Sequence, residues 1–420
     1  MAWPAVRVLR DRNAGLYLVA VIVSGFGDSA MSLAAGIWVK TLTGSNGLAA
    51  LVGFCFWLPT FAGPVIGTAA DRVRRRPLLA ATNLALAAVM TAPLAVHTKA
   101  DVWVLFAVLT MVGAGMVLTE AAETALVAAA VPQELRGDFN GLVFTASEGM
   151  KLLAPPAGAV LFTRFGGPVV AVLDAVTFVL AALAFRFIRV KEAPPAARAK
   201  RAWTTETAEG ARYLWRHPLL RPLVLTGGAA MALSGLSSTA TFALLDAGLH
   251  RSPAFAGVLT AFQGLGSAVS GLAAGALMRR TSERAFSAIG LALFALGVLA
   301  RATPWPPVVL GGSLAIGLGL PCALIAAMTA VQRESPGELL GRVAATAGTL
   351  MFAPTGLALL VGTGMVAALD YRVQTLAAGA VGLAVAAALT VTGRVGRAGR
   401  TPAPDRAEPE PETRRVESTP

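Results

Sequence analysis

Charged residues are scarce in this sequence. They make up 14% of the 420 residues, whereas 55% are hydrophobic. Soluble domains contain roughly a quarter charged residues. The low charge therefore excludes an ordinary soluble protein and indicates that lipid surrounds much of the surface.

Cysteine and histidine are almost absent. The two cysteines, Cys55 and Cys322, both lie inside apolar segments, which gives no basis for a disulfide framework. The three histidines, His97, His217 and His250, are expected at the ends of loops and form no metal-binding pattern. We therefore expect neither a metal nor a cofactor.

Sequence motifs of ATP-driven transport and of common hydrolases are also missing. The sequence contains no G-x-x-x-x-G-K-[ST], no H-E-x-x-H and no G-x-S-x-G. This absence argues against an enzyme.

Long apolar runs are what the sequence has in abundance. A helix needs about 20 apolar residues to cross a hydrocarbon core of about 30 Å, and runs of this length are too long for barrel strands. The first run continues past residue 35 without an A-x-A site, so it is expected to be an uncleaved helix and not a signal peptide. Twelve helices are predicted, near 15–40, 47–70, 77–97, 101–131, 138–163, 167–189, 219–246, 253–278, 285–302, 306–331, 341–368 and 372–393.

The positive charges are unevenly distributed between the predicted loops. With a cytoplasmic N-terminus, 28 of the 35 Lys and Arg residues fall on the cytoplasmic side, in the termini and alternate loops. This is the asymmetry of the positive-inside rule. It predicts a multi-pass protein of the cell membrane with both termini in the cytoplasm. The net charge of +12 is then an orientation signal and does not indicate nucleic-acid binding.

One long polar stretch divides the predicted helices six and six. The predicted organisation is an N-terminal six-helix bundle at 1–189, a cytoplasmic linker at 190–218, a C-terminal six-helix bundle at 219–393 and a disordered tail at 394–420.

The two halves resemble each other at an offset of 204 residues. PQELRG at 132–137 matches PGELLG at 336–341. Small residues four apart, which allow helices to approach closely, recur in the second helix of each half: Gly63 and Gly67, then Gly271 and Gly275. We infer a duplication, with two halves related by an axis along the membrane normal, as in one class of transporters.

The loop after the second predicted helix resembles a known signature. Residues 67–76 contain Gly67, Asp71, Arg72, Arg75 and Arg76, spaced as in the loop 2–3 signature of the major facilitator superfamily. Arg74 departs from it where a second glycine is usual. The resemblance implies an all-α polytopic membrane protein with twelve transmembrane helices in two six-helix bundles.

Further segments resemble the drug and siderophore exporter branch, which includes macrolide efflux proteins. They are TGS at 43–45, LDAVTF at 173–178, EGARYLWRHPLL at 209–220 and QRESPGELLGR at 332–342. This resemblance implies export of amphipathic small molecules.

Asp71 and its neighbouring arginines are a candidate cytoplasmic gate. A carboxylate at a helix end can accept hydrogen bonds from a facing helix N-terminus or from arginines, and such a contact forms only when the bundles close on that side. The alternative is that residues 71–76 are only a positively charged membrane anchor.

Ionisable residues inside the first-half helices are candidate proton carriers. Each costs about 2.5–3.5 kcal/mol at helix-centre depth on insertion scales. The candidates are Asp28, Glu120, Glu123, Glu148 and Lys151, and the last four align with uncharged residues in the second half. Two alternatives remain: a static Glu148–Lys151 pair, and Asp28 capping a kink beside Gly25 and Gly27.

The fifth predicted helix resembles a degenerate antiporter signature of drug exporters. It carries Gly149, Pro155, Pro156 and Gly158, whose alternative role is structural kinking. Aromatic residues are candidates for an apolar substrate cavity, or else face lipid or a neighbouring helix: Trp38, Trp57, Phe144, Phe242, Phe262 and Phe352.

These features favour a proton-coupled antiporter that exports amphipathic small molecules by alternating access. Its expected partners are the lipid bilayer, protons and a small-molecule substrate, and we expect a monomer. Two alternatives are a transporter-fold sensor or scaffold that works through its linker or tail, and an uptake carrier for a polar solute.

Overall fold

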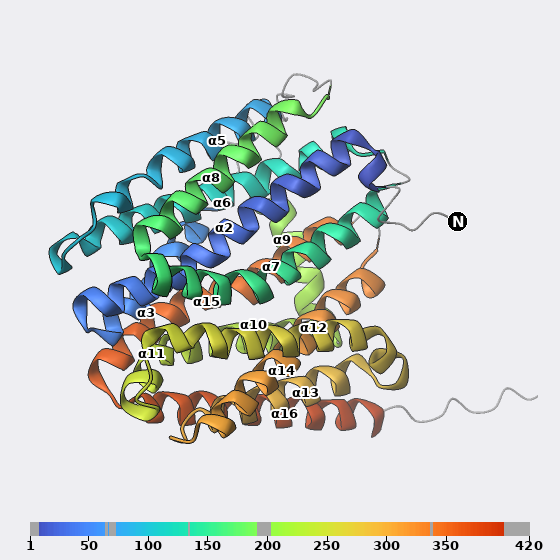
Figure 1. Cartoon of the computed structure of the whole chain (residues 1–420). Helices are drawn as coiled ribbons and strands as arrows, with labels where there is room; N and C mark the ends of the chain where they lie inside the picture. The colour runs from blue at the N-terminus through green and yellow to red at the C-terminus, as the bar shows by residue number, and fades with distance from the viewer. Residues whose placement is uncertain are drawn as a thin grey trace, which may run out of the picture.

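The computed structural model of the chain is all-helical in the residues it describes, which are 8–63, 66, 73–132, 135–190, 203–336 and 339–398. Figure 1 shows two groups of long helices lying side by side, one built from the first half of the chain and one from the second. This confirms the predicted fold class.

The first group contains six long helical segments. They are α2 (Arg12–Thr43), α3 (Asn46–Trp57) continued by a 3-10 turn at Leu58–Ala62, α5 (Arg75–Val89), α6 (Val102–Ala130), α7 (Arg136–Phe165) and α8 (Gly167–Phe187). Helix α2 packs against α7 and α8, and α5 packs against α6 and α8.

The second group repeats this pattern with one irregular helix. Its members are α10 (Leu220–Thr239), α11 (Thr241–Ala243), α12 (Ala256–Arg280), α13 (Glu283–Ala300), α14 (Pro306–Glu334), α15 (Leu340–Ala368) and α16 (Tyr371–Ala398). A π-helical turn at Leu244–Gly248 follows α11, where a regular helix end was predicted. The main contacts join α13 to α14 and α16, α12 to α14, and α10 to α15.

All twelve predicted helices have counterparts. Ten helical segments among the described residues are long and apolar enough to cross a membrane, and Asn46–Ala62 is a shorter apolar one. The 30-residue α7 is not among the ten, because charged residues such as Glu148 and Lys151 interrupt its apolar run.

The two ends of the bundle differ. The end at which α2 begins, α8 ends and α16 ends is called the linker end here, and the opposite end the far end (right and left in Figure 1). At the far end, Gly44 ends α2 in the left-handed conformation (φ 69°), and the Ser45 side chain caps α3. This short turn holds the first two helices together.

The predicted linker contains a helix that the sequence analysis did not foresee. Helix α9 (Trp203–Arg216) packs against α15, where Gly210 lies against the Arg342 backbone and Arg342 pairs with Glu209. The predicted tail at 394–420 also begins too early, since α16 continues to Ala398. Residues 399–420 lie outside the described part of the chain.

The predicted orientation is testable by cysteine labelling. In a background with Cys55→Ala and Cys322→Ala, we expect Ser45→Cys to react with a membrane-impermeant maleimide added outside intact cells. Pro404→Cys should react only after the membrane is opened, because the 28 cytoplasmic charges orient the chain. Labelling of both positions from the same side would contradict the topology.

Candidate functional site

An acidic pair lies between α2 and α8, inside the first bundle. Asp28 stands in the middle of α2, and Asp174 lies one-third of the way along α8 from the far end. The two carboxyl groups interact electrostatically. Gly27 permits the approach, because a Cβ there would overlap Asp174 Oδ1 and Thr177 Oγ1.

Both carboxyl groups of this pair have an oxygen that is buried away from solvent. Asp174 is 1% exposed, and its Oδ1 accepts a hydrogen bond from Thr177 Oγ1 at 3.1 Å. Asp174 Oδ2 and Asp28 Oδ1 are buried without a hydrogen-bond partner. Leaving a buried polar atom unpaired costs about 1–3 kcal/mol. Binding of a cation or a proton between the two carboxyl groups would remove this cost. The sequence analysis identified Asp28 and missed Asp174.

The two glutamates of α6 lie nearer the linker end. The Tyr17 hydroxyl of α2 forms a side-chain hydrogen bond with Glu123, and Glu120 acts electrostatically on Glu123. The ring of Tyr17 packs edge-on against Phe139 and Phe185, with centroids 5.2 and 5.8 Å away. Glu123 is half-buried and Glu120 is exposed.

The fifth helix of the bundle links the two halves. Helix α7 packs against α2 in its own half and against α12 in the other. Pro155 and Pro156 lie inside it, and Gly158 lies against the Ala30 backbone. The side chains of Glu148, Lys151 and Phe144 lie outside the described part of the structure, so their roles stay predictions.

Four glycines that were predicted to mark bends or close packing have few neighbours among the described residues. A Cβ added to Gly149 or Gly271 meets nothing within 4 Å. At Gly63 it meets only Val117, and at Gly275 only the Arg279 side chain, each at 3.7 Å. The packing role of these four glycines therefore stays a prediction. Spacing of four places small residues on one face but does not specify a neighbour for that face.

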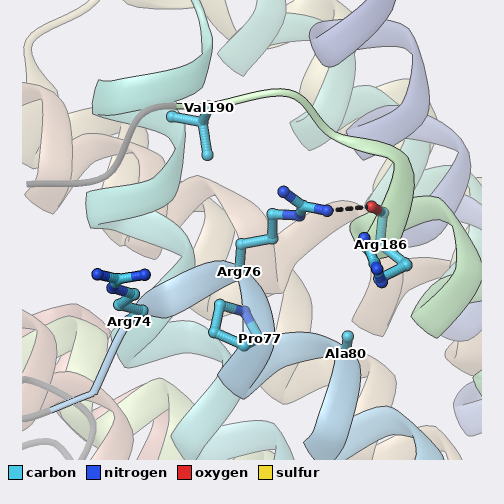
Figure 2. Close-up of a pocket in the computed structure, with 6 residues that line it drawn as sticks. All are labelled: Arg74, Arg76, Pro77, Ala80, Arg186 and Val190. Carbon is cyan, nitrogen blue, oxygen red and sulfur yellow. Dashed lines mark hydrogen bonds between the residues drawn. The ribbon is translucent and has the colours of Figure 1, made fainter.

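The predicted cytoplasmic gate is described only in part. Gly67, Asp71 and Arg72 lie outside the described residues, and Arg75 begins α5. Figure 2 shows Arg76 donating a hydrogen bond to the Arg186 carbonyl oxygen at 2.5 Å, at the linker ends of α5 and α8. Both residues line a basic cavity of about 390 Å³, together with Arg74, Pro77, Ala80 and Val190.

The two bundles meet in a seam toward the far end. Lys40 Nζ of α2 lies 2.7 Å from Asp246 Oδ2, in the π-helical turn of the second half, and also donates to the Gly44 carbonyl oxygen. The Lys40 side chain is 9% exposed. This ion pair was not foreseen, because Lys40 is the last residue of the predicted helix 15–40 and nothing near it in the sequence points to a partner 206 residues away.

Apolar contacts continue this seam. Gly36 lies against the ring of Phe242, Gly53 against Leu359, Gly257 against Ala159 and Gly356 against Phe61. Except for Phe61, which lies in the 3-10 turn after α3, these residues lie at the middle of their helices or closer to the far end. The seam therefore holds the bundles together on that side.

The predicted cavity aromatics occupy different environments. The Trp38 side chain of α2 is buried against Gly167 and Phe162, and Phe242 is buried in the seam. In this conformation both belong to the packed core. A cavity role for these two stays a prediction about another conformation. Phe262 and Phe352 are exposed and Trp57 is half-buried, and their cavity role stays a prediction.

The second bundle buries a positive charge instead of acids. Arg301, just after α13, is 5% exposed and donates to Ser313 Oγ at 3.1 Å and to Gln263 Oε1 at 3.4 Å. Burial lowers the pKa of Arg301 to about 10, which leaves it protonated at neutral pH. Arg301 lies in the last turn of the predicted helix 285–302, and its burial was not foreseen.

Comparison with family models finds one match over nearly the whole chain. The model described as Major Facilitator Superfamily matches residues 17–248 and 229–418. Comparison with curated protein sequences finds no match.

Similar solved structures are transporters. The chain resembles the peptide transporter POT in complex with sulfate (TM-score 0.68, 17% identity, covering 92% of this chain and 95% of that one). It also resembles the nucleoside transporter NupG (0.69, 12%, 91% and 99%). A third is a bacterial homologue of the iron transporter ferroportin in an inward-facing state (0.69, 16%, 90% and 98%). At these identities the likeness shows the fold and leaves the substrate open.

Proposed function

The chain belongs to the Major Facilitator Superfamily, and we propose that within it this transporter is a proton-coupled antiporter that exports amphipathic small molecules. The observation that supports coupling is Asp28, a carboxyl group in the middle of α2 with an unpaired buried oxygen. An ionisable group at this depth is expensive and marks an ion pathway by default.

The charges of the two halves support the same proposal. Glu120 and Glu123 add two carboxyl groups to the first bundle, whereas their counterparts at the repeat offset are Leu324 and Ala327. A need of the fold alone would apply to both halves equally. A scaffold also has no use for intramembrane acids, which is why we place the sensor alternative second.

The seam supports alternating access as the mechanism of this proposal. With the termini in the cytoplasm, the far end faces outward, so the structure is closed to the outside. Transport then requires the Lys40–Asp246 pair to separate while the linker end closes, and Asp71 is proposed to stabilise that second closure. The proton moves inward down its gradient as the drug moves outward.

The size of the proton gradient is sufficient. One inward proton supplies about 2.3 kcal/mol per 100 mV. A pH difference adds about 1.4 kcal/mol per unit. Since about 1.4 kcal/mol corresponds to a tenfold concentration ratio, a neutral drug can be concentrated well over tenfold.

We expect Asp28→Asn and Glu120→Gln each to abolish uphill transport and to leave downhill flux measurable. Each variant removes a proton carrier without changing side-chain shape, so the helix movements remain possible. The measurement is pH-gradient-driven accumulation in inside-out vesicles over a panel of radiolabelled macrolides and siderophores, compared with efflux from preloaded vesicles. Glu209→Gln, a change outside the bundles, is the matched control.

The outcomes separate the candidate functions. If both variants still build the full gradient, proton coupling at these residues is wrong. Accumulation of a polar solute in right-side-out vesicles would favour the uptake carrier. A chain that moves no compound of the panel in either direction would favour the sensor or scaffold.

A further inference from the structure

The feature that the proposed function leaves unexplained is Asp174. It lies on α8 against Gly27, the residue before Asp28, interacts electrostatically with Asp28, and is more deeply buried than Asp28, Glu120 or Glu123. Two carboxylates in one apolar site repel each other strongly, so both cannot carry a charge at once without a cation.

We propose that Asp28 and Asp174 form one site that binds a single exchangeable proton between α2 and α8. The proposal rests on the proposed proton coupling for its function, and it adds the second carboxyl group of the site. Asp28 is the member with partial exposure, through which the proton enters and leaves. Asp174 is the buried partner that positions and shares it.

The hydrogen-bond pattern fits one shared proton. The single proton of the Thr177 hydroxyl is shared between the Asp174 carbonyl oxygen at 2.7 Å and Asp174 Oδ1 at 3.1 Å, and Oδ2 is the atom of that carboxyl group without a hydrogen-bond partner. Asp28 offers the free atom Oδ1. A proton on one of these oxygens supplies a donor that the other accepts, so one proton can satisfy two buried atoms that now lack partners.

The surroundings supply no compensating cation among the described side chains. The charge that acts on Asp174 is that of Asp28, and Asp28 itself is influenced by burial. Helix α7 packs against α2 and carries Glu148 and Lys151, whose side chains lie outside the described part. The described residues also contain no group of three or more ligands for a metal ion, which favours a proton over a divalent cation.

The site also lies where a proton could be coupled to movement. Helix α2 runs the full depth of the first bundle and carries Lys40 of the seam in its last turn, twelve residues after Asp28. Helix α8 belongs to the same bundle. Protonation therefore changes the charge of the contact between α2 and α8 on the helix that also forms the seam.

The test is labelling with dicyclohexylcarbodiimide, which reacts with protonated carboxyl groups in apolar surroundings. The purified full chain in nanodiscs is labelled across a pH series, and adducts at each carboxyl are quantified by mass spectrometry. Asp370 serves as the internal reference, since it is exposed to solvent, lies outside apolar surroundings and should stay unlabelled. The readout requires neither a substrate nor transport.

We expect label on the pair at neutral pH in the parent protein. In Asp28→Asn the pH of half-labelling at Asp174 should fall by about one unit or more, and Asp174→Asn should move it at Asp28 by the same amount, because a shared proton couples the two titrations. If Asp174→Asn does not fold, Asp28→Asn alone gives the decisive shift. An unchanged half-labelling pH in Asp28→Asn overturns the proposal.

Two further arms distinguish the alternatives. If sodium chloride suppresses the label and choline chloride does not, the site binds sodium and the proton proposal is wrong. In a Lys151→Met background, Asp28→Asn should still shift the half-labelling pH at Asp174. If the shift disappears there, the two carboxyl groups interact through an ion pair with Lys151, and the shared-proton proposal is wrong. Coupled titration together with full uphill transport by Asp28→Asn would retain the proton site and overturn only the proposed transport function.

Discussion

Gly319→Val is expected to lose most of the folded protein. Helices α13 and α14 approach at paired glycines, where Gly290 lies against Gly319 and Gly297 against Gly312. A Cβ at Gly319 would overlap the Gly290 carbonyl oxygen and the Phe294 backbone nitrogen, and would lie 2.9 Å from Phe294 Cα. These neighbours are backbone atoms, which cannot rotate away. The two helices must separate to accommodate valine.

The magnitude should reach the upper end of the overpacking range. Extra methyl groups in a packed core cost about 1–3 kcal/mol, and a backbone clash leaves little room for relief. We expect a fall in Tm and a loss of the monodisperse peak in fluorescence-detected size-exclusion chromatography. Gly311→Val is the matched control, because it lies on the same helix and a Cβ there meets nothing within 4 Å. Equal stability of the two variants would contradict the role of this contact.

The fold could be predicted because hydropathy and charge are properties of whole segments. Each of the twelve apolar runs became a helix, and Gly-containing breaks such as Gly44 and Gly166 mark helix ends at the far side. Helix α9 was missed because its alternation of polar and apolar residues has too little apolar length for a membrane helix. Its docking onto α15 depends on Arg342, which is distant in sequence.

The candidate site was predictable only in part. Asp28 stands out as a lone charge in an apolar helix, and the same signal was present at Asp174, with Thr177 one turn later on the same face. It was not used there because the segment was considered only as part of the LDAVTF resemblance. What no local pattern could give is the approach of α8 to Gly27, which requires the packed bundle.

The sequence could not predict that two cations at helix ends are buried. Lys40 and Arg301 both follow or end apolar helices, where a long cationic side chain normally reaches water. The structure turns Lys40 toward Asp246 and Arg301 toward Ser313. The first partner is 206 residues away in the other bundle, so the ion pair exists only in a conformation in which the bundles meet.

A disulfide across the seam should stop transport completely. A Cβ at Gly47 of α3 lies 3.4 Å from Ala367 Cβ of α15, close to the Cβ separation of disulfides, which is about 3.5–4.5 Å. In the background without Cys55 and Cys322, we expect Gly47→Cys/Ala367→Cys to cross-link under mild oxidation. The bond would fix the far end closed, and alternating access requires that end to open.

The control for this experiment lies within one bundle. A Cβ at Gly235 of α10 is also 3.4 Å from a Cβ on α15, that of Ala358, but both helices belong to the second half. Gly235→Cys/Ala358→Cys should therefore cross-link without stopping transport, if the bundles move as units. Reduction with dithiothreitol should restore drug transport by the seam variant to the rate of its unoxidised form.

Adding Asp246→Lys should slow cross-linking at the seam. The substitution places a second positive charge beside Lys40, and the repulsion separates the bundles at the far end, so the two cysteines meet less often. The control pair lies within one bundle and should cross-link at an unchanged rate. If the fully cross-linked seam variant transports drug as fast as its dithiothreitol-reduced form, the far end does not open during the cycle.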